Sequence, residues 1–235
     1  MTFSLAEIDP EDPRWDKRGA PYMHGERNQG EFRQARPLPV DLTDSEILKR
    51  GLEAFAELGY SGASVRELTR RMAVNHNFIN DRFGSKMNFW RAVVDNAVAG
   101  PHEEIMEIFG SSSGDVEKFE AVIRRMYLLS THEPDMNRIV SDISVLDSSR
   151  LDYLYSNYNG PFLEALAPLV QRLVEAGKMR EISMDVLYSA LIGPAIFLSQ
   201  QQLGRRIRGV ADPSPEELES TAFNLAGVVI RGLLA

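Results

Sequence analysis

Residues 64–86 bring together side chains whose types suit contacts with a DNA duplex. The amides of Asn77 and Asn80 can pair with the edge of an adenine, and the ring of Phe78 can touch a thymine methyl group. A guanidinium, an ammonium and a hydroxyl at a helix N-terminus suit phosphate groups. Together these types define a candidate set for DNA contact: Ser64, Arg66, Asn75, His76, Asn77, Phe78, Asn80 and Lys86.

Each candidate also has a simpler interpretation. Ser64, Arg66 and Lys86 would serve equally as solvated surface groups, and Phe78 would be explained by packing against the first helix. Asp81 lies in the same stretch, and its carboxylate would be unfavourable near a phosphate group. The choice between these interpretations depends on the elements that hold the residues.

The spacing of caps and apolar residues predicts three short helices over residues 43–90. The first two begin with capping boxes, Thr43-x-x-Glu46 and Ser64-x-x-Glu67, in which each side chain accepts from an otherwise unpaired backbone N–H. Gly59 is predicted to end the first helix, because glycine adopts the left-handed conformation found after many helices.

The predicted connection between the second and third helices is only residues 73–75, and Asn75 is predicted to cap the third helix. Two helices joined by so short a turn form a helix-turn-helix motif, which presents its second helix to the DNA major groove. Apolar residues at helical spacing are predicted to form the core beneath it: Leu48, Leu52, Phe55, Val65, Leu68, Met72, Val74, Ile79 and Phe83.

Taken in order and without gaps, this segment resembles the DNA-binding domain of the TetR family of bacterial transcriptional regulators. The matching residues are Leu48, Phe55, Ala56, Gly59, Tyr60, Ser64, Val65, Arg66, Glu67, Leu68, Val74, Asn75, Ile79 and the run Phe83-Gly84-Ser85-Lys86. Beyond residue 100 the likeness is one of architecture. The chain departs from the family at Phe78, where a small residue or Thr is common, and at Asn80, Asp81 and Arg82, where aromatic residues or His are common. Family contacts at these four positions therefore do not transfer.

The net charge of −8 first argues against a nucleic-acid partner, but its distribution along the chain removes the conflict. Residues 1–43 carry a net charge of −2, residues 44–91 carry +2 and residues 92–235 carry −8. DNA affinity depends on positive charge that faces phosphate rather than on the total for the chain. We expect modest non-specific affinity for DNA.

Composition excludes several other classes. A hydrophobic content of 43% supports a packed core, and no apolar run reaches the length of a membrane-spanning helix. The N-terminus is acidic and does not fit a secretory signal. The absence of cysteine excludes disulfides and thiolate metal sites and fits a cytoplasmic protein. No P-loop or GxGxxG motif occurs, and His24, His76, His102 and His132 lack metal spacing, so no enzyme, cofactor or metal is predicted.

The sequence predicts an all-α protein in three parts: an irregular extension over residues 1–40, a helix-turn-helix domain over residues 41–86, and a ligand-binding and dimerisation domain over residues 87–235. The extension is rich in proline and glycine, which favours irregular structure. Its basic residues leave open a second interpretation, an arm that follows the DNA: Arg14, Lys17, Arg18, Arg27, Arg33 and Arg36.

The helical part is predicted to contain helices over residues 86–99, 102–109, 115–131, 135–146, 149–177, 184–205 and 215–234, the first of them ending before Pro101. Pro161 is predicted to kink the helix 149–177 and to free the carbonyl group of Asn157. Aromatic residues crowd around that kink, which indicates either ordinary core packing or an apolar ligand cavity. The candidates for lining the cavity are Met106, Phe109, Met126, Tyr127, Tyr155, Asn157, Tyr158, Phe162, Leu166 and Phe197.

The resemblance implies a homodimer that pairs through the last two long helices, and helix 215–234 carries a broader apolar face than one neighbour requires. The expected interface residues are Leu191, Leu198, Leu218, Ala222, Leu225 and Val229. The sequence therefore predicts a DNA-binding transcriptional regulator, a repressor released from a pseudo-palindromic operator by a small apolar or aromatic effector. Two alternatives stay open: an architectural or division-linked DNA-binding protein without an effector, and a protein–protein adaptor.

Overall fold

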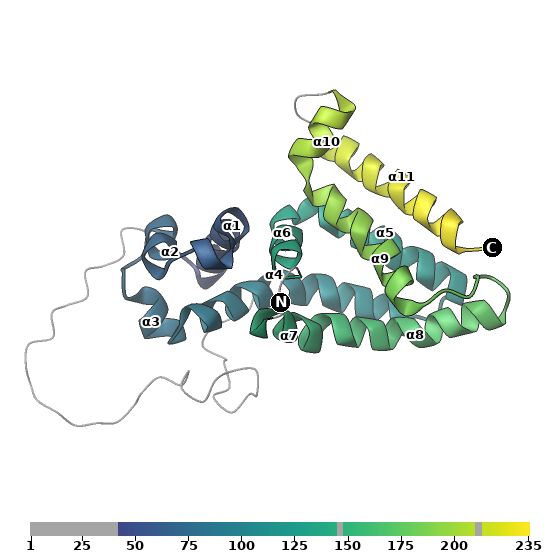
Figure 1. Cartoon of the computed structure of the whole chain (residues 1–235), viewed down its shortest axis with the longest axis horizontal. Coiled ribbons are helices and arrows are strands. Elements are labelled where there is room, and N and C mark those ends of the chain that lie inside the picture. The colour runs from purple at the N-terminus through teal and green to yellow at the C-terminus, as the bar shows by residue number, and fades with distance from the viewer. Residues whose placement is uncertain (1–41, 145–147, 210–212) are drawn as a thin grey trace, which may run out of the picture. The chain divides into compact units, whose positions relative to one another are not determined.

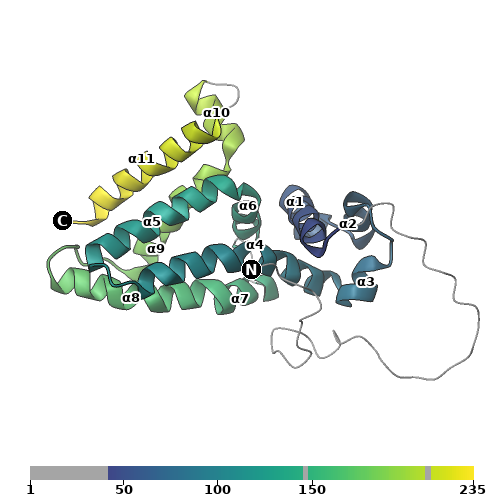
Figure 2. The same ribbon diagram turned by 180° about the vertical axis from the view of Figure 1, so that it is seen from behind.

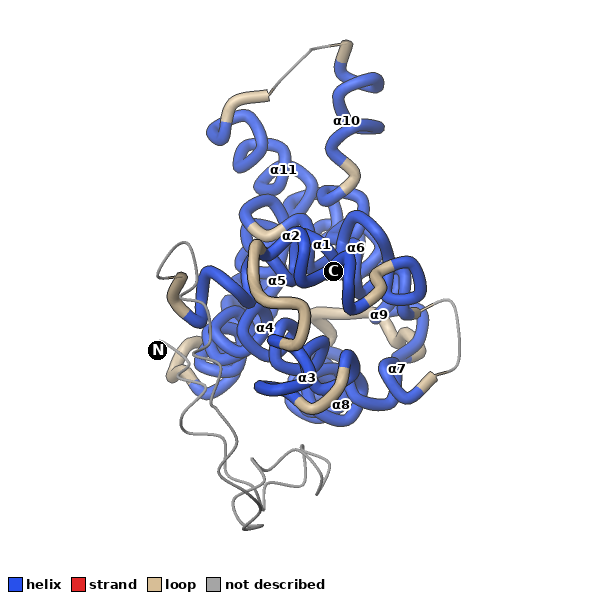
Figure 3. The backbone as a smooth tube through the Cα atoms, turned by 90° about the vertical axis from the view of Figure 1, so that its left-hand side faces the viewer, coloured by secondary structure: helices blue, strands red, loops and turns tan. Residues whose placement is uncertain are grey.

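The computed structural model describes residues 42–144, 148–209 and 213–235, and within these ranges the chain is built from helices and loops (Figure 1). The expected all-α fold is confirmed for this part of the chain, because its only β-type pairing is an isolated bridge between Met179 and Leu234. Figure 3, coloured by secondary structure, marks the same described ranges as helix or loop. The described chain divides into two compact units, the first ending at Ala97 and the second beginning at Val98.

The first unit holds α1 (Asp44–Gly62), α2 (Val65–Met72), α3 (Phe78–Phe83) and the beginning of α4 (Lys86–Gly110). The predicted capping box of α1 is present, since Thr43 N donates to Glu46 Oε2 at 2.8 Å and Glu46 N donates to Thr43 Oγ1 at 3.3 Å. Gly59 has φ 66° and ψ 162°, so regular helix stops there and a further turn continues to Gly62. The predicted end of the first helix is therefore confirmed.

The turn between α2 and α3 is longer than the sequence predicts. Ala73 ends α2 in the left-handed conformation, with φ 58°. The Asn75 side chain accepts from Asn77 N at 3.0 Å, and Phe78 N donates to the carbonyl oxygen of Asn75 at 2.9 Å. Asn75 thus caps a single tight turn, and the regular helix α3 begins at Phe78 rather than directly after Asn75.

The second unit contains the rest of α4, α5 (Asp115–His132), α6 (Pro134–Ile143), α7 (Ser149–Leu154), a π-helical turn (Tyr155–Asn159), α8 (Gly160–Glu175), α9 (Met184–Ser199), α10 (Gln201–Arg208) and α11 (Pro215–Leu233). Helix α5 packs against α8, α9 and α11, and so forms the centre of this unit (Figure 2). The predicted helices 115–131 and 215–234 agree with α5 and α11 to within one residue at each end.

Three predicted helix divisions are wrong, and the predicted helix 135–146 ends earlier, as α6 at Ile143, with residues 145 and 146 outside the described ranges. Helix α4 runs unbroken through Pro101, so the separate helix at 102–109 does not exist; Gly100 carries no Cβ that the proline ring would meet, which removes part of the usual clash before proline. The predicted helix 149–177 is three segments joined at the π-helical turn. The predicted helix 184–205 breaks at Gln200, whose φ of −83° and ψ of 57° are not helical.

The π-helical turn lies at the position where the sequence predicts a kink. The N–H of Gly160 donates to the carbonyl oxygen of Tyr155, five residues earlier. A Cβ atom on Gly160 would lie 3.0 Å from that oxygen, so the turn favours glycine at this position. Pro161 follows directly. Because proline has no N–H, it cannot donate the α-helical hydrogen bond to the carbonyl oxygen of Asn157, four residues earlier.

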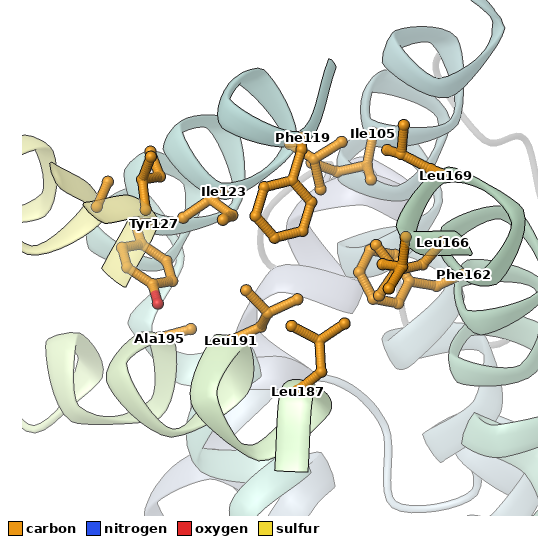
Figure 4. Packing of buried hydrophobic residues seen from close by; sticks show 14 of the residues in the cluster. Ile105, Phe119, Ile123, Tyr127, Phe162, Leu166, Leu169, Leu187, Leu191 and Ala195 are labelled. Carbon is orange, nitrogen blue, oxygen red and sulfur yellow. The ribbon is translucent and has the colours of Figure 1, made fainter. Parts of the chain in front are cut away.

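The core of the second unit is a hydrophobic cluster drawn from α4, α5, α8, α9 and α11, part of which is shown in Figure 4. Helix α5 contributes Phe119, Ile123 and Tyr127, and the facing helices contribute Ile105, Phe162, Leu166, Leu169, Leu187, Leu191 and Ala195. Burial raises the pKa of the Tyr127 phenol, whose hydroxyl group donates to the carbonyl oxygen of Ala190 at 3.4 Å. This hydrogen bond joins the Tyr127 side chain of α5 to the backbone of α9.

The junction of α4 and α5 carries the letters of a hydrolase sequence motif. Residues 110–114 read Gly-Ser-Ser-Ser-Gly, which fits the letters GxSxG of a hydrolase nucleophile elbow. Such an elbow requires a strand that turns sharply into a helix. Here the segment joins two helices, so Ser112 is not positioned as that nucleophile.

Candidate nucleic-acid interface and ligand site

Helix α3 has one buried and one exposed face. Ile79 is fully buried and Phe83 is 3% exposed, as the sequence predicts, whereas Val74 in the preceding turn is only half-buried. His76, Asn77 and Asn80 are exposed, and none of them is held by a side-chain hydrogen bond to another described residue. Asn80 of α3 and the two residues just before the helix, His76 and Asn77, therefore present amide and imidazole groups to the surroundings.

Phe78 lies at the edge of that face rather than fully on it. Its side chain is half-buried, and its ring centroid lies 6.1 Å from that of Phe83. The guanidinium carbon of Arg82 lies 5.9 Å from the centre of the Phe78 ring. Phe78 thus packs in part, and the ring contacts that the structure shows are with Phe83 and Arg82 of its own helix.

Most of the cations of the first unit have partners inside the fold. Arg71 bridges Glu57 of α1 and Glu67 of α2, and Arg70 also binds Glu67. The hydrogen bonds from Arg70 and Arg71 lower the pKa of Glu67 to about 2. Arg66 is exposed and has no ion pair with any described residue, so its guanidinium is available for phosphate.

Lys86 uses its ammonium group within the first unit. The Nζ atom donates to the carbonyl oxygens of Tyr60 and Ala63 at 2.8 and 3.0 Å, and it lies 4.1 Å from the centre of the Tyr60 ring. These bonds satisfy carbonyl groups at the end of α1. Because an ammonium has three donors, the predicted phosphate contact of Lys86 would have to share it with this structural role.

Ser64 acts as the N-cap of α2, where its hydroxyl oxygen accepts from Glu67 N at 3.2 Å. The hydroxyl remains exposed beside the first N–H groups of α2. Such a helix N-terminus favours anions through its unpaired N–H groups and its dipole. The predicted phosphate contact at Ser64 is therefore compatible with its capping role.

The predicted ligand residues fall into two groups in the second unit. Phe162, Leu166 and Tyr127 are buried in the core cluster, Phe109 lies against Phe162 with ring centroids 5.8 Å apart, and Met106 and Met126 are half-buried. Tyr155, by contrast, is 55% exposed. Phe197 is 41% exposed and does not belong to the buried core cluster.

The π-helical turn gathers polar groups around the predicted residues Asn157 and Tyr158, and three of these groups, His102, Asn159 and Tyr188, were not among the predicted ligand residues. The rings of His102 and Tyr158 meet edge-to-face with centroids 5.5 Å apart, and burial lowers the pKa of His102. Asn159 Nδ2 donates to the hydroxyl oxygen of Tyr188 at 3.0 Å. Asn157 Nδ2 is occupied, because it donates to the carbonyl oxygen of Tyr153 at 2.8 Å. No sequence motif links His102 to Tyr158, since they are brought together only by the packing of α4 on the π turn.

The expected dimer residues are mostly used inside the single chain. Leu191 is fully buried, Leu198 is 7% exposed and Ala222 is 2% exposed, so these three belong to the core and cannot form an exposed interface. Leu225 and Val229 are half-buried and pack on the same core, and Leu218 is also half-buried. The exposed apolar side chains of α9 and α11 are others: Val186, Phe197, Phe223 and Val228.

Among the described residues, none of the helices is both long and apolar enough to cross a membrane. No three side chains of the His, Asp and Glu types come together there as ligands of a metal ion would.

Comparison with known proteins agrees with this geometry. Residues 47–93 match the model of the family described as "Bacterial regulatory proteins, tetR family". Over 61 residues the chain is 28% identical to the uncharacterized HTH-type transcriptional regulator YezE of Bacillus subtilis, a match that covers 26% of this chain. It spans only 31% of the length of that curated relative.

The fold is shared by solved structures along most of the chain. The ketosteroid transcriptional regulator KstR2 of Mycobacterium tuberculosis superposes with a TM-score of 0.66 at 15% identity, covering 84% of this chain and 98% of that one. The fatty acid degradation regulator FadR of Bacillus halodurans gives 0.61 at 12% identity, covering 81% and 100%. With its ordered helix-turn-helix motif and a helical second unit of the same fold, the chain is a member of the TetR family of helix-turn-helix transcriptional regulators, a family that is not enzymatic.

Proposed function

We propose that the protein is a homodimeric repressor that binds a pseudo-palindromic DNA operator and is released from it by a small apolar or aromatic effector. The observation that carries the DNA-binding step is the exposure of Asn77, just before α3, and of Asn80 within it, whose side chains make no hydrogen bond to another described residue. The two helices of the motif are joined by a short turn, and this arrangement suits insertion of α3 into a major groove.

The contacts divide by chemistry. Asn77 and Asn80 read base edges, because a side-chain amide can donate and accept against an adenine. Arg66 and Ser64 hold phosphate groups, and Lys86 adds positive charge nearby while capping α1. His76 and Asn75 flank the turn before α3, and Phe78 offers the exposed part of its ring to a thymine methyl group.

The dimer forms through the outer faces of α9 and α11. On α9, Val186 and Phe197 are 52% and 41% exposed, and the helical repeat places them on one face with Gly193 between them. Gly193 has open space where a Cβ would be, so a second helix can approach closely there. On α11, Val228 is 59% exposed and is the apolar residue that we assign to this interface. To read successive major grooves, the two recognition helices of such a dimer must lie about 34–36 Å apart.

The effector enters the second unit beside the π-helical turn. Tyr158, His102 and Asn159 supply the polar end, and Phe162 and Leu166 supply the apolar wall. Because Phe162 and Leu166 are packed in the core, the effector must displace side chains and select an opened state of the unit. Helix α4 is continuous from Lys86 to Gly110, so a movement of its second half is transmitted to the turn before Lys86. The effector weakens DNA binding by its differential affinity for the two states.

Selection of binding sites from random DNA tests the proposal. The wild-type protein is expected to enrich a two-fold symmetric site, and Asn77→Ala or Asn80→Ala to lose the preference at particular base pairs. Enrichment of no sequence would leave an architectural role, and no retention of DNA at all would leave a protein–protein adaptor. Leu166→Trp fills the effector site and should abolish ligand release while operator binding persists; release at the normal effector concentration would place the site elsewhere.

A further inference from the structure

The second unit carries a groove that the proposed effector site does not include. It lies between α5 and α11, which run side by side in Figure 2, and it has a volume of about 660 Å³. Sites for small molecules usually measure about 300–1,000 Å³. The groove is lined by Ala121, Arg124, Arg125, Leu128, Glu216, Glu219, Ser220, Ala222 and Phe223.

Arg124 is the unusual residue of this groove. Its Nη1 atom is buried and has no hydrogen-bond partner among the described residues. Its Nη2 atom is 3.4 Å from Glu120 Oε2, which is a long contact for an ion pair. Its guanidinium carbon lies 4.8 Å from the centre of the Phe223 ring. The Arg124 side chain as a whole is 36% exposed and lines the groove, so an anion in the groove can reach the guanidinium and pair with it.

The other charged groups of the groove are already engaged or lie at its rim. Arg125 is paired with Glu104 of α4, and Glu219 lies 3.0 Å from Nε2 of His132. Glu216 stands in the first turn of α11, where a carboxylate is favoured by the helix N-terminus. Between these groups the surface is apolar and consists of Ala121, Leu128, Ala222 and the ring of Phe223. The groove thus places the guanidinium of Arg124 beside an apolar surface.

This surface is distinct from the proposed dimer face. Phe223 is 62% exposed and Val228 is 59% exposed, and both belong to α11. Successive residues of an α-helix turn by about 100°, so two residues five positions apart point about 140° away from each other. A second copy bound through Val228 therefore leaves Phe223 and the groove on another side of the helix.

We propose that the α5–α11 groove is a second ligand site, which binds an organic anion with an apolar body, such as a fatty carboxylate. The carboxylate accepts hydrogen bonds from the guanidinium of Arg124, and planar bidentate pairing of this kind is what arginine provides best. The hydrocarbon chain covers Phe223 and Leu128. This site goes beyond the effector site at the π-helical turn, with which it shares none of the named residues.

Calorimetric titration of the full chain with decanoate, kept below its micelle-forming concentration, tests the site, with decanol as the uncharged control. Decanoate is expected to bind at one site per chain, and Arg124→Gln is expected to weaken it about tenfold or more, since a hydrogen bond to a charged group is lost. Arg138→Gln removes the same charge from α6, where Arg138 pairs with Asp135, and should leave the affinity unchanged. Decanol should bind weakly and should not respond to Arg124→Gln.

Ala121→Trp gives a second, steric test, because its indole would fill the groove from α5, and it is expected to abolish decanoate binding. Leu166→Trp, which blocks the effector site, should leave decanoate binding intact. If decanoate binding is lost in Leu166→Trp and kept in Arg124→Gln and Ala121→Trp, the anion occupies the effector site and the groove proposal is overturned. Failure to bind decanoate at all also overturns it, while the effector proposal is then judged by DNA release alone.

Discussion

The Nη2 atom of Arg82 lies 2.8 Å from the carboxylate of Asp44, which joins the last turn of α3 to the first residue of α1. The side chain of Arg82 is 42% exposed and that of Asp44 is 28% exposed, so the pair lies at the surface. Surface pairs of this kind contribute about 0–1 kcal/mol to stability. The more important effect of Asp44 is electrostatic, because it neutralises a cation of the recognition helix.

Asp44→Asn is therefore expected to tighten non-specific DNA binding. The substitution frees the charge of Arg82, and each added phosphate contact steepens the salt dependence of affinity by about 0.9 in the logarithmic slope. Fluorescence anisotropy with random duplex DNA at several salt concentrations measures this slope. Asp142→Asn removes an exposed acid from α6 in the second unit and serves as the control. An unchanged slope for Asp44→Asn would show that Arg82 does not face the phosphate backbone.

Arg66→Ala and Asn77→Ala are expected to weaken DNA binding in different ways. Loss of Arg66 removes a phosphate contact, so affinity should fall for all sequences and the salt slope should flatten. Loss of Asn77 should cost about 1–3 kcal/mol on the selected operator and little on random DNA, if its base contact is bidentate. Equal losses on both DNAs for Asn77→Ala would contradict its role in base reading.

The proposed dimer face predicts a contrast between two residues of one helix. Val228→Asp should give monomers, because an unpaired charge would be buried in the interface. Phe223→Asp places the same charge on the groove side of α11 and should remain dimeric. Light scattering of both variants measures the mass. Monomers from Phe223→Asp together with dimers from Val228→Asp would move the interface to the opposite side of the helix.

The low pKa of Glu67 predicts an acid-sensitive contribution to stability. Its carboxyl pKa is about 2 in the folded chain and about 4.3 when unperturbed, so the folded state favours the ionised form. This contribution is present above pH 4.3 and is lost as the pH falls toward 2. The free energy of unfolding of Glu67→Gln should thus be lower than that of the wild type at pH 6 and approach it near pH 2. A constant difference across this range would assign the effect to something other than ionisation.

Local signals predicted the first unit well and the second unit less well. The capping box at Thr43 and the break at Gly59 depend on neighbouring residues only, and both are present. The continuation of α4 through Pro101 and the break at Gln200 depend on packing that periodicity does not contain. Periodicity also identified apolar positions on α9 and α11, but it does not tell whether the same chain or a second chain covers them. In the structure, Leu191 and Ala222 lie in the core of the chain, while Val186 and Val228 are exposed.

The π-helical turn at Tyr155–Asn159 has a consequence for the history of the chain. A hydrogen bond that spans five residues instead of four accommodates one residue more than an α-helical turn, as an insertion into an existing helix would. In a regular α-helix, an extra residue would rotate what precedes it by about 100°. The widened turn absorbs the extra residue, so removing one residue from this segment would restore an ordinary α-helical turn and leave α7 and α8 facing their present neighbours. Relatives that differ by a single insertion or deletion here would share the surfaces of both α7 and α8 and differ in the turn between them.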